Sequence, residues 1–225
     1  MFKSLSLKVI IFGFIFTFFS SFGQSFFLGL FNSSIREALS ISHGQFGTIY
    51  ASATLLSSFI LIWLGKKIDE VDIFKFASIV TILLSFSCFF FSKISSVVFL
   101  FFAIFLMRFS GQGMMSHTAT TTVSRYFTKS RGKALSTIWF GLSSAEFILP
   151  VFTIFLLTLT DWRNIWIIIS VFVILSLPLA SFILVKNLNF NSRETEDDFK
   201  NENQNIKNWK RKEVLKDYRF YILGA

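Results

Sequence analysis

The fold is decided by stretches such as residues 163–185, RNIWIIISVFVILSLPLASFILV, whose only charge is at its first residue. The hydrocarbon core of a bilayer is about 30 Å thick, and roughly 20 apolar residues in a helix cross it. Residues 163–185 are long enough and apolar enough to do so. The stretch therefore predicts a transmembrane helix.

Five further stretches have the same character and are separated by short polar segments. Hydrophobic residues make up 53% of the chain and charged residues only 16%, which favours a membrane protein over a soluble domain. The first stretch is much longer than the h-region of a signal peptide, so we expect it to remain as a helix. We predict an all-α integral membrane protein with six transmembrane helices, the first five being residues 8–31, 45–64, 73–91, 97–124 and 134–157.

The predicted domains are a six-helix transmembrane bundle at 1–185 and a charged cytoplasmic linker at 186–217, followed by the start of a seventh span at 218–225. Short connections make consecutive helices antiparallel neighbours. Spans one to three and four to six then have the parity of an inverted repeat. Because the last residues resemble the beginning of a further span, we expect the chain to be half of a larger protein.

The basic residues indicate the orientation of the bundle. If the N-terminus is cytoplasmic, 18 of the 22 Lys and Arg residues lie on the cytoplasmic side, in agreement with the positive-inside rule. We therefore predict a multi-pass protein of the cell (inner) membrane with its N-terminus inside. The net charge of +9 is then a topology signal and an attraction to the lipid bilayer, and it gives no reason to expect nucleic acid as a partner.

The fourth span contains the most informative polar residues, RFSGQG at 108–113. An arginine in the middle of a bilayer costs at least about 2.5 kcal/mol, so it faces a partner, a cavity or a ligand. In a regular helix Gln112 lies one turn from Arg108 on the same face. Gly111 and Gly113 would allow a neighbouring helix or a substrate to approach the backbone closely.

The fifth span offers a carboxylate at a similar depth, Glu146. Two interpretations stay open: Arg108 and Glu146 pair and only join two helices, or they take part in substrate binding and proton coupling. Pro150 removes a backbone hydrogen bond and is expected to kink this span.

Two other polar residues have competing interpretations. Gln24 in the first span either presents its amide to the same cavity or forms a hydrogen bond between helices. His117 is expected to make a helix-to-helix hydrogen bond, although an imidazole also titrates near neutral pH.

The sequence lacks the usual signatures of catalysis. It has no H-E-x-x-H, Walker A, G-x-S-x-G or paired-carboxylate pattern, and Cys88 is its only cysteine. We predict no enzyme activity, no cofactor and no metal site. A membrane-embedded enzyme would need His117 beside an accessible carboxylate.

Several loops resemble those of the major facilitator superfamily. Residues 63–69, WLGKKID, resemble the start of its signature loop, and 161–163, DWR, resemble its turn before span six. Residues 108–113 with 125–127, RYF, and 131–134, RGKA, are similar to its fourth span and the following loop. After Asp69 the loop departs from the family pattern, with Glu70 and Asp72 in place of basic residues.

The resemblance implies the N-terminal six-helix half of a secondary transporter that works by alternating access. Substrate would bind between two six-helix halves, and the missing C-terminal half would come from further sequence or from a second chain. Gly65 and Asp69 would form a conformational latch. The expected solute is a small polar or anionic molecule, moved with a proton or another ion; the candidate binding and coupling residues are Gln24, Arg108, Gln112 and Glu146.

Because the fifth span lacks the G-x-x-x-G-P pattern, drug efflux is disfavoured. The alternative is a six-span structural or interaction protein without transport activity, which would recruit a partner through its charged tail.

Overall fold

The computed structural model describes residues 4–127, 129–186 and 216–218. It divides the chain into Met1–Leu188 and Asn189–Ala225, and only the first unit has enough described residues for an account of its fold. Most of the predicted linker and of the seventh span lies outside the described residues.

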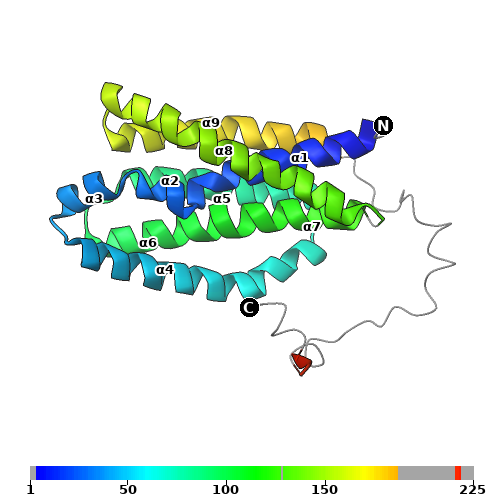
Figure 1. The fold of residues 1–225 in the computed structure, drawn as a ribbon, viewed down its shortest axis with the longest axis horizontal. Coiled ribbons are helices and arrows are strands. Elements are labelled where there is room, and N and C mark those ends of the chain that lie inside the picture. Colours follow the sequence, from blue (N-terminus) through cyan, green and yellow to red (C-terminus); the bar gives the residue numbers. More distant parts are fainter. Residues whose placement is uncertain (1–3, 128, 187–215, 219–225) are drawn as a thin grey trace. The chain divides into compact units, whose positions relative to one another are not determined.

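Six helices in the described residues are long and apolar enough to cross a membrane, which confirms the predicted all-α membrane class. They run lengthwise through the bundle, with α9 along one side and α4 along the opposite side (Figure 1). The spans are α1 (Ser4–Ser20) with η1 (Ser21–Gly23) and α2 (Ser25–Gly29), α4 (His43–Leu64), α5 (Ile73–Ser92), α6 (Val97–Met107) with η3 (Arg108–Met115) and α7 (Ser116–Tyr126), α8 (Arg131–Leu159), and α9 (Trp162–Val185).

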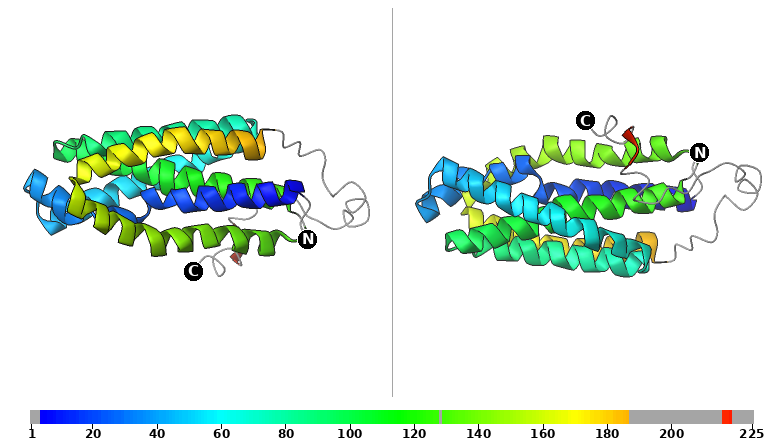
Figure 2. Two further views of the ribbon diagram at one scale, coloured as in Figure 1. Left: turned by 90° about the horizontal axis from the view of Figure 1, so that it is seen from above. Right: turned by 90° about the horizontal axis from the view of Figure 1, so that it is seen from below.

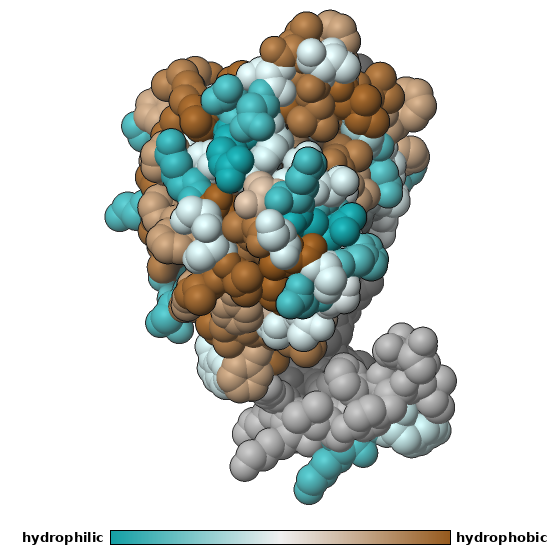
Figure 3. Space-filling model, turned by 90° about the vertical axis from the view of Figure 1, so that its left-hand side faces the viewer, coloured by the Kyte–Doolittle hydropathy of each residue, from teal (hydrophilic) through white to brown (hydrophobic). Residues whose placement is uncertain are grey.

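Polar residues at the span boundaries determine where several helices begin. Ser42 and Gln45 form a reciprocal capping box at the start of α4, because each side chain bonds the backbone of the other residue. Ser96 and Asp161 cap α6 and α9 by accepting a hydrogen bond from a first-turn N–H. The end of the bundle that carries α3 shows hydrophilic side chains among hydrophobic ones (Figure 3), as expected where helices leave a membrane.

The connection after the first span is more ordered than a polar loop. Residues 32–39 form the helix α3 (Asn32–Leu39), which buries Ile35 and ends at Ser40 in the left-handed conformation, with φ of 52°. A second short helical segment, η2 (Gly65–Asp69), connects α4 to α5.

The core forms between helices that are distant in the sequence. α5 and α9 lie side by side (Figure 2) and are joined by two reciprocal hydrogen bonds. The Ser85 hydroxyl donates to the backbone carbonyl of Ser170 at 2.9 Å, and the Ser170 hydroxyl donates to the backbone carbonyl of Ser85 at 2.8 Å. Near the α3 end, the fully buried Trp166 packs against Phe27, Phe31 and Phe91 with ring centroids 4.5 to 5.5 Å apart. Cys88 is fully buried and packs in this core as a small apolar side chain.

Candidate functional site

Two membrane spans lose regular α-helical structure where they cross. The first span is interrupted at Gln24, whose φ of −81° and ψ of 155° are extended and separate η1 from α2. The fourth span contains a π-helical segment, η3, which covers RFSGQG. π-Helical turns are rare and occur frequently at functional sites. The irregular segment of the first span and that of the fourth span contact each other, so they form one candidate site within the bundle.

Glycines bring the two irregular segments together. A Cβ added at Gly111 would lie 2.7 Å from the backbone nitrogen of Gly23 and 2.8 Å from its Cα. A Cβ at Gly23 would collide with the carbonyl of Met107 and lie 2.5 Å from the nitrogen of Gln112. The two backbones can approach this closely only because neither residue has a side chain. Gly113 is less constrained, since its nearest side-chain neighbour is the flexible end of Leu61.

The interruption at Gln24 gives Arg108 its hydrogen-bond partner. Arg108 is only 7% exposed, and its Nη1 donates to the carbonyl of Gly23 at 3.0 Å and to Oγ of Ser25 at 3.3 Å. The guanidinium also lies 5.4 Å from the ring centroid of Tyr50 on α4. The Nε of Arg108 is buried and has no hydrogen-bond partner. All of these neighbours are neutral, so the positive charge of Arg108 is not balanced by a carboxylate in the described part of the chain.

Ser25 connects the arginine to the second span. Its hydroxyl oxygen accepts from Arg108 and from the hydroxyl of Tyr50, which is 2.9 Å away. Because both of these groups donate, the hydrogen of the Ser25 hydroxyl remains available to an acceptor. Ser25 is exposed and Tyr50 is half-buried, so this end of the network is open.

Glu146 does not pair with Arg108. It is exposed on α8, and no hydrogen bond or ion pair joins the two described side chains. The interpretation as a structural pair therefore does not describe this conformation. α8 continues as one helix from Arg131 to Leu159 through Pro150.

The two glutamines lie at the crossing but form no side-chain hydrogen bond there. Gln24 and Gln112 are half-buried, and no side-chain partner is found for either among the described residues. The interhelical hydrogen bond considered for Gln24 is absent from this conformation. The π-helical hydrogen bonding of η3 also changes the regular i, i+4 relation expected between Arg108 and Gln112. Both side-chain amides are therefore uncommitted in the described residues.

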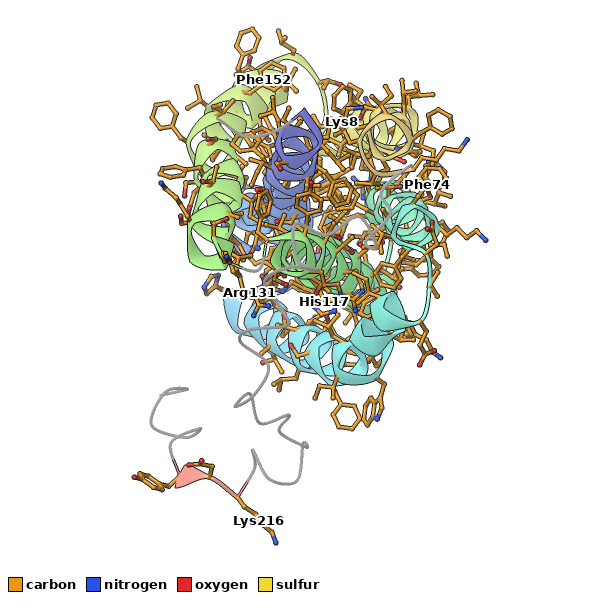
Figure 4. All side chains as sticks on the ribbon, turned by 90° about the vertical axis from the view of Figure 1, so that its right-hand side faces the viewer. Lys8, Phe74, His117, Arg131, Phe152 and Lys216 are labelled. Atoms are coloured by element: carbon orange, nitrogen blue, oxygen red, sulfur yellow. The ribbon has the colours of Figure 1, made fainter. Side chains whose placement is uncertain are left out.

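The segment predicted as a latch is attached to the fourth span. His117 Nε2 lies 2.8 Å from the carbonyl of Gly65, and Arg125 Nη1 donates to the carbonyl of Ile68 at 3.3 Å. His117, labelled in Figure 4, thus makes the interhelical contact that its position predicted, between α7 and the first residue of η2. The side chain of Asp69 is outside the described part of the structure, so its latch role remains a prediction.

Sequence reasoning identified neither Tyr50 nor Ser25 as a site residue. A tyrosine near the end of a span is common in membrane helices, so its position alone gives no functional signal. The signal that was available is the polar face that Tyr50 forms on α4 with Thr54 and Ser57, at spacings of four and seven residues. In the described residues, no three His, Cys, Asp or Glu side chains lie close enough together to hold a metal ion.

Comparison with known families agrees with this architecture. A family model described as Major Facilitator Superfamily matches residues 13–225, which is nearly the whole chain. No curated protein and no solved structure matches the chain significantly.

Proposed function

Because the chain belongs to the major facilitator superfamily, a family of membrane transporters, we propose that it takes part in the secondary transport of a small polar or anionic solute by alternating access. The proposal extends family membership in three respects: the chemical class of the solute, the residues that bind it, and the coupling to a proton or another ion.

The observation that carries the proposal is the uncompensated charge of Arg108. A guanidinium inside a membrane span normally faces a counter-charge, a cavity or a ligand, because its desolvation is costly. Here its protein neighbours are a carbonyl, a hydroxyl and an aromatic ring. An anionic group of the solute would supply the missing charge, and the free hydrogen of the Ser25 hydroxyl would provide a further donor to it.

Gln24, Gln112 and Glu146 complete the proposed site. The two amides can donate to or accept from polar groups of the solute. Glu146 is the candidate proton carrier, since its exposed carboxylate is not committed to an ion pair in the described conformation. Protonation of Glu146 in one orientation of the transporter and release in the other would couple solute movement to a proton gradient.

We place the solute between this bundle and a second six-helix bundle, supplied by the same protein or by another chain. α4 and α8 support this placement, because only 11% of an 18-residue apolar window in each span is buried, against 50% or more in the first, third and fourth spans. Both helices also expose polar side chains, among them Ser52 on α4 and Ser143 on α8. Lipid is a poor neighbour for such faces, whereas a second bundle enclosing a polar pathway is a good one. Gly65 and Asp69 would then act as the latch between the two bundles.

A six-span structural or interaction protein is the less favoured alternative. Such a protein would have no use for an arginine without a counter-charge beside two irregular membrane segments. The family is one of transporters and not of enzymes, which also gives no support to a catalytic role.

We further propose the cell (inner) membrane as the location, with the N-terminus in the cytoplasm; the asymmetric distribution of Lys and Arg supports this orientation.

Uptake by membrane vesicles tests the proposal. The vesicles are prepared from cells that express the gene at its native locus, and radiolabelled acetate, succinate, phosphate and glucose are the probes. A hydrogen bond to a charged group contributes about 1.5–3 kcal/mol, so Arg108→Ala should lower anion uptake by about 10- to 100-fold while membrane insertion is unchanged. Glu146→Gln should remove the dependence of that uptake on a proton gradient. Normal anion uptake by Arg108→Ala vesicles would eliminate Arg108 from the mechanism.

A further inference from the structure

A second concave site lies on the opposite side of the first span from the polar network. This groove has a volume of about 420 Å³ and runs between α8 and α9, with η1 and the end of α1 as its floor. We call it the α8–α9 groove; its principal lining residues are Phe18, Phe19, Phe22, Phe152, Leu156 and Phe172. Figure 4 shows α1 between α8 and α9 and Phe152 on the outer side of α8.

The lining of the groove is almost entirely hydrocarbon. Thr153 is the only lining residue with a polar side chain, and it is 3% exposed. A water molecule needs two to four polar partners to occupy a cavity, and the groove does not offer them. A polar solute is excluded for the same reason. The occupant must therefore be apolar.

The open side of the groove is continuous with a surface that faces the membrane. Ile168, Phe152 and Phe172 at its margin are 52–57% exposed, and they belong to helices that are long and apolar enough to span a bilayer. In that position the groove is surrounded by lipid tails. If it stayed empty, its aromatic walls would lose their dispersion contacts on one side.

From this geometry we propose that the α8–α9 groove binds one acyl chain of a membrane phospholipid. Its volume falls within the range of about 300–1,000 Å³ that is typical of ligand sites. Since lipid tails are as apolar as leucine, the preference for the groove over the rest of the surface comes from shape and close packing. The lining residues come from the last turns of α8 and the first turns of α9. The bound acyl chain therefore belongs to a lipid of the leaflet beside the α8–α9 turn.

The acyl chain has a structural role at this position. Phe22 in the floor directly precedes Gly23, whose carbonyl accepts from Arg108. The lipid therefore packs behind the interruption of the first span, while the solute site lies on its other side. The groove is distinct from the proposed transport site, and its test does not depend on transport.

Photo-crosslinking in nanodiscs tests this proposal. The full chain is placed in a phosphatidylglycerol bilayer that includes a phospholipid with a diazirine in the middle of one acyl chain, and crosslinked residues are mapped by mass spectrometry. Crosslinks per exposed residue should be severalfold more frequent at Phe152 and Phe172 than at Leu175 and Ile183, which are 69% and 59% exposed on α9 but do not line the groove. A uniform distribution over these positions would overturn the proposal.

Two matched variants on α9 sharpen the test. Ile168→Trp places a larger side chain at the groove, whereas Ile183→Trp makes the same change at a lipid-facing residue of similar exposure outside it. The first variant should lower crosslinking at Phe152 severalfold, and the second should leave it unchanged. Equal crosslinking in the two variants contradicts specific binding. The map of the unsubstituted protein decides the question even if the first variant does not fold.

Discussion

At the scale of single residues, the proposed function depends on Arg108 and on the neutrality of its surroundings. The carbonyl of Gly23 and the hydroxyl of Ser25 satisfy Nη1, but neither supplies a negative charge. Hydrogen bonds without a counter-charge recover only part of the desolvation free energy of a buried cation. Arg108 should therefore reduce the stability of the solute-free protein while providing a binding group for an anion.

This reasoning predicts the sign of a stability change. Arg108→Met removes the charge but keeps a long, flexible side chain, so it should raise the free energy of unfolding by about 1 kcal/mol or more. Thermal unfolding of the purified protein without added anion measures this as an increase in Tm. Lys133→Met, at an exposed position in the first turn of α8, is the control and should leave Tm almost unchanged. A clear decrease in Tm for Arg108→Met would show that the arginine stabilises the fold.

The sequence identified Arg108 because the cost of burying its charge is independent of the fold. It did not identify the partners of Arg108, since they depend on the position of the interruption in the first span and on the packing of α4 beside it. The same limitation applied to Glu146: similar depth in the membrane suggested a pair, but the faces of the two helices determine whether side chains meet.

At the scale of helices, the six spans were predictable, whereas their irregular segments were not. A bilayer imposes a minimum length on every span, so a continuous apolar stretch is a strong signal. The extended residue Gln24 and the π-helical η3 carry no comparable pattern, because they exist where two backbones meet. The helix α3 was also missed, since its polar sequence resembles a loop.

The close contact between Gly23 and Gly111 predicts that alanine substitution changes stability in opposite directions at Gly111 and at Gly47, a glycine without close neighbours. Gly111→Ala places a Cβ 2.7 Å from the nitrogen of Gly23 and should lower stability by about 1–3 kcal/mol through overpacking. Gly47→Ala on α4 has no neighbouring atom within 4 Å of the new Cβ and should raise stability by up to about 1 kcal/mol through helix propensity. Thermal unfolding of both variants provides the measurement. If both substitutions shift Tm in the same direction, the close crossing is not a major determinant of stability.

At the scale of the whole molecule, the bundle predicts which end lies inside the cell. The turn between α5 and α6 and the turn between α7 and α8 lie at opposite ends of the spans, so a membrane separates them. From the distribution of Lys and Arg we predict that the second of these turns is cytoplasmic. This prediction of the orientation follows from charge counts and does not depend on how the helices pack.

Cysteine labelling of intact cells tests this orientation. In a Cys88→Ser background, Ser95→Cys should react with a membrane-impermeant maleimide, whereas Ser130→Cys should react only after the cells are opened. Both residues are exposed in turns, so their accessibility differs only through the membrane. The reverse labelling pattern would place the N-terminus outside and contradict the predicted topology.

The most direct test of the central claim is a comparison of anion binding by the unsubstituted protein and by Arg108→Gln. Thermal unfolding is measured at constant ionic strength with acetate, succinate or inorganic phosphate, and with glucose as the neutral solute. A ligand that binds only the folded state raises Tm. Our account predicts that at least one anion raises the Tm of the unsubstituted protein, that this increase is lost in Arg108→Gln, and that glucose affects the two proteins equally. If no anion stabilises the unsubstituted protein more than Arg108→Gln, Arg108 does not bind the charge of a solute.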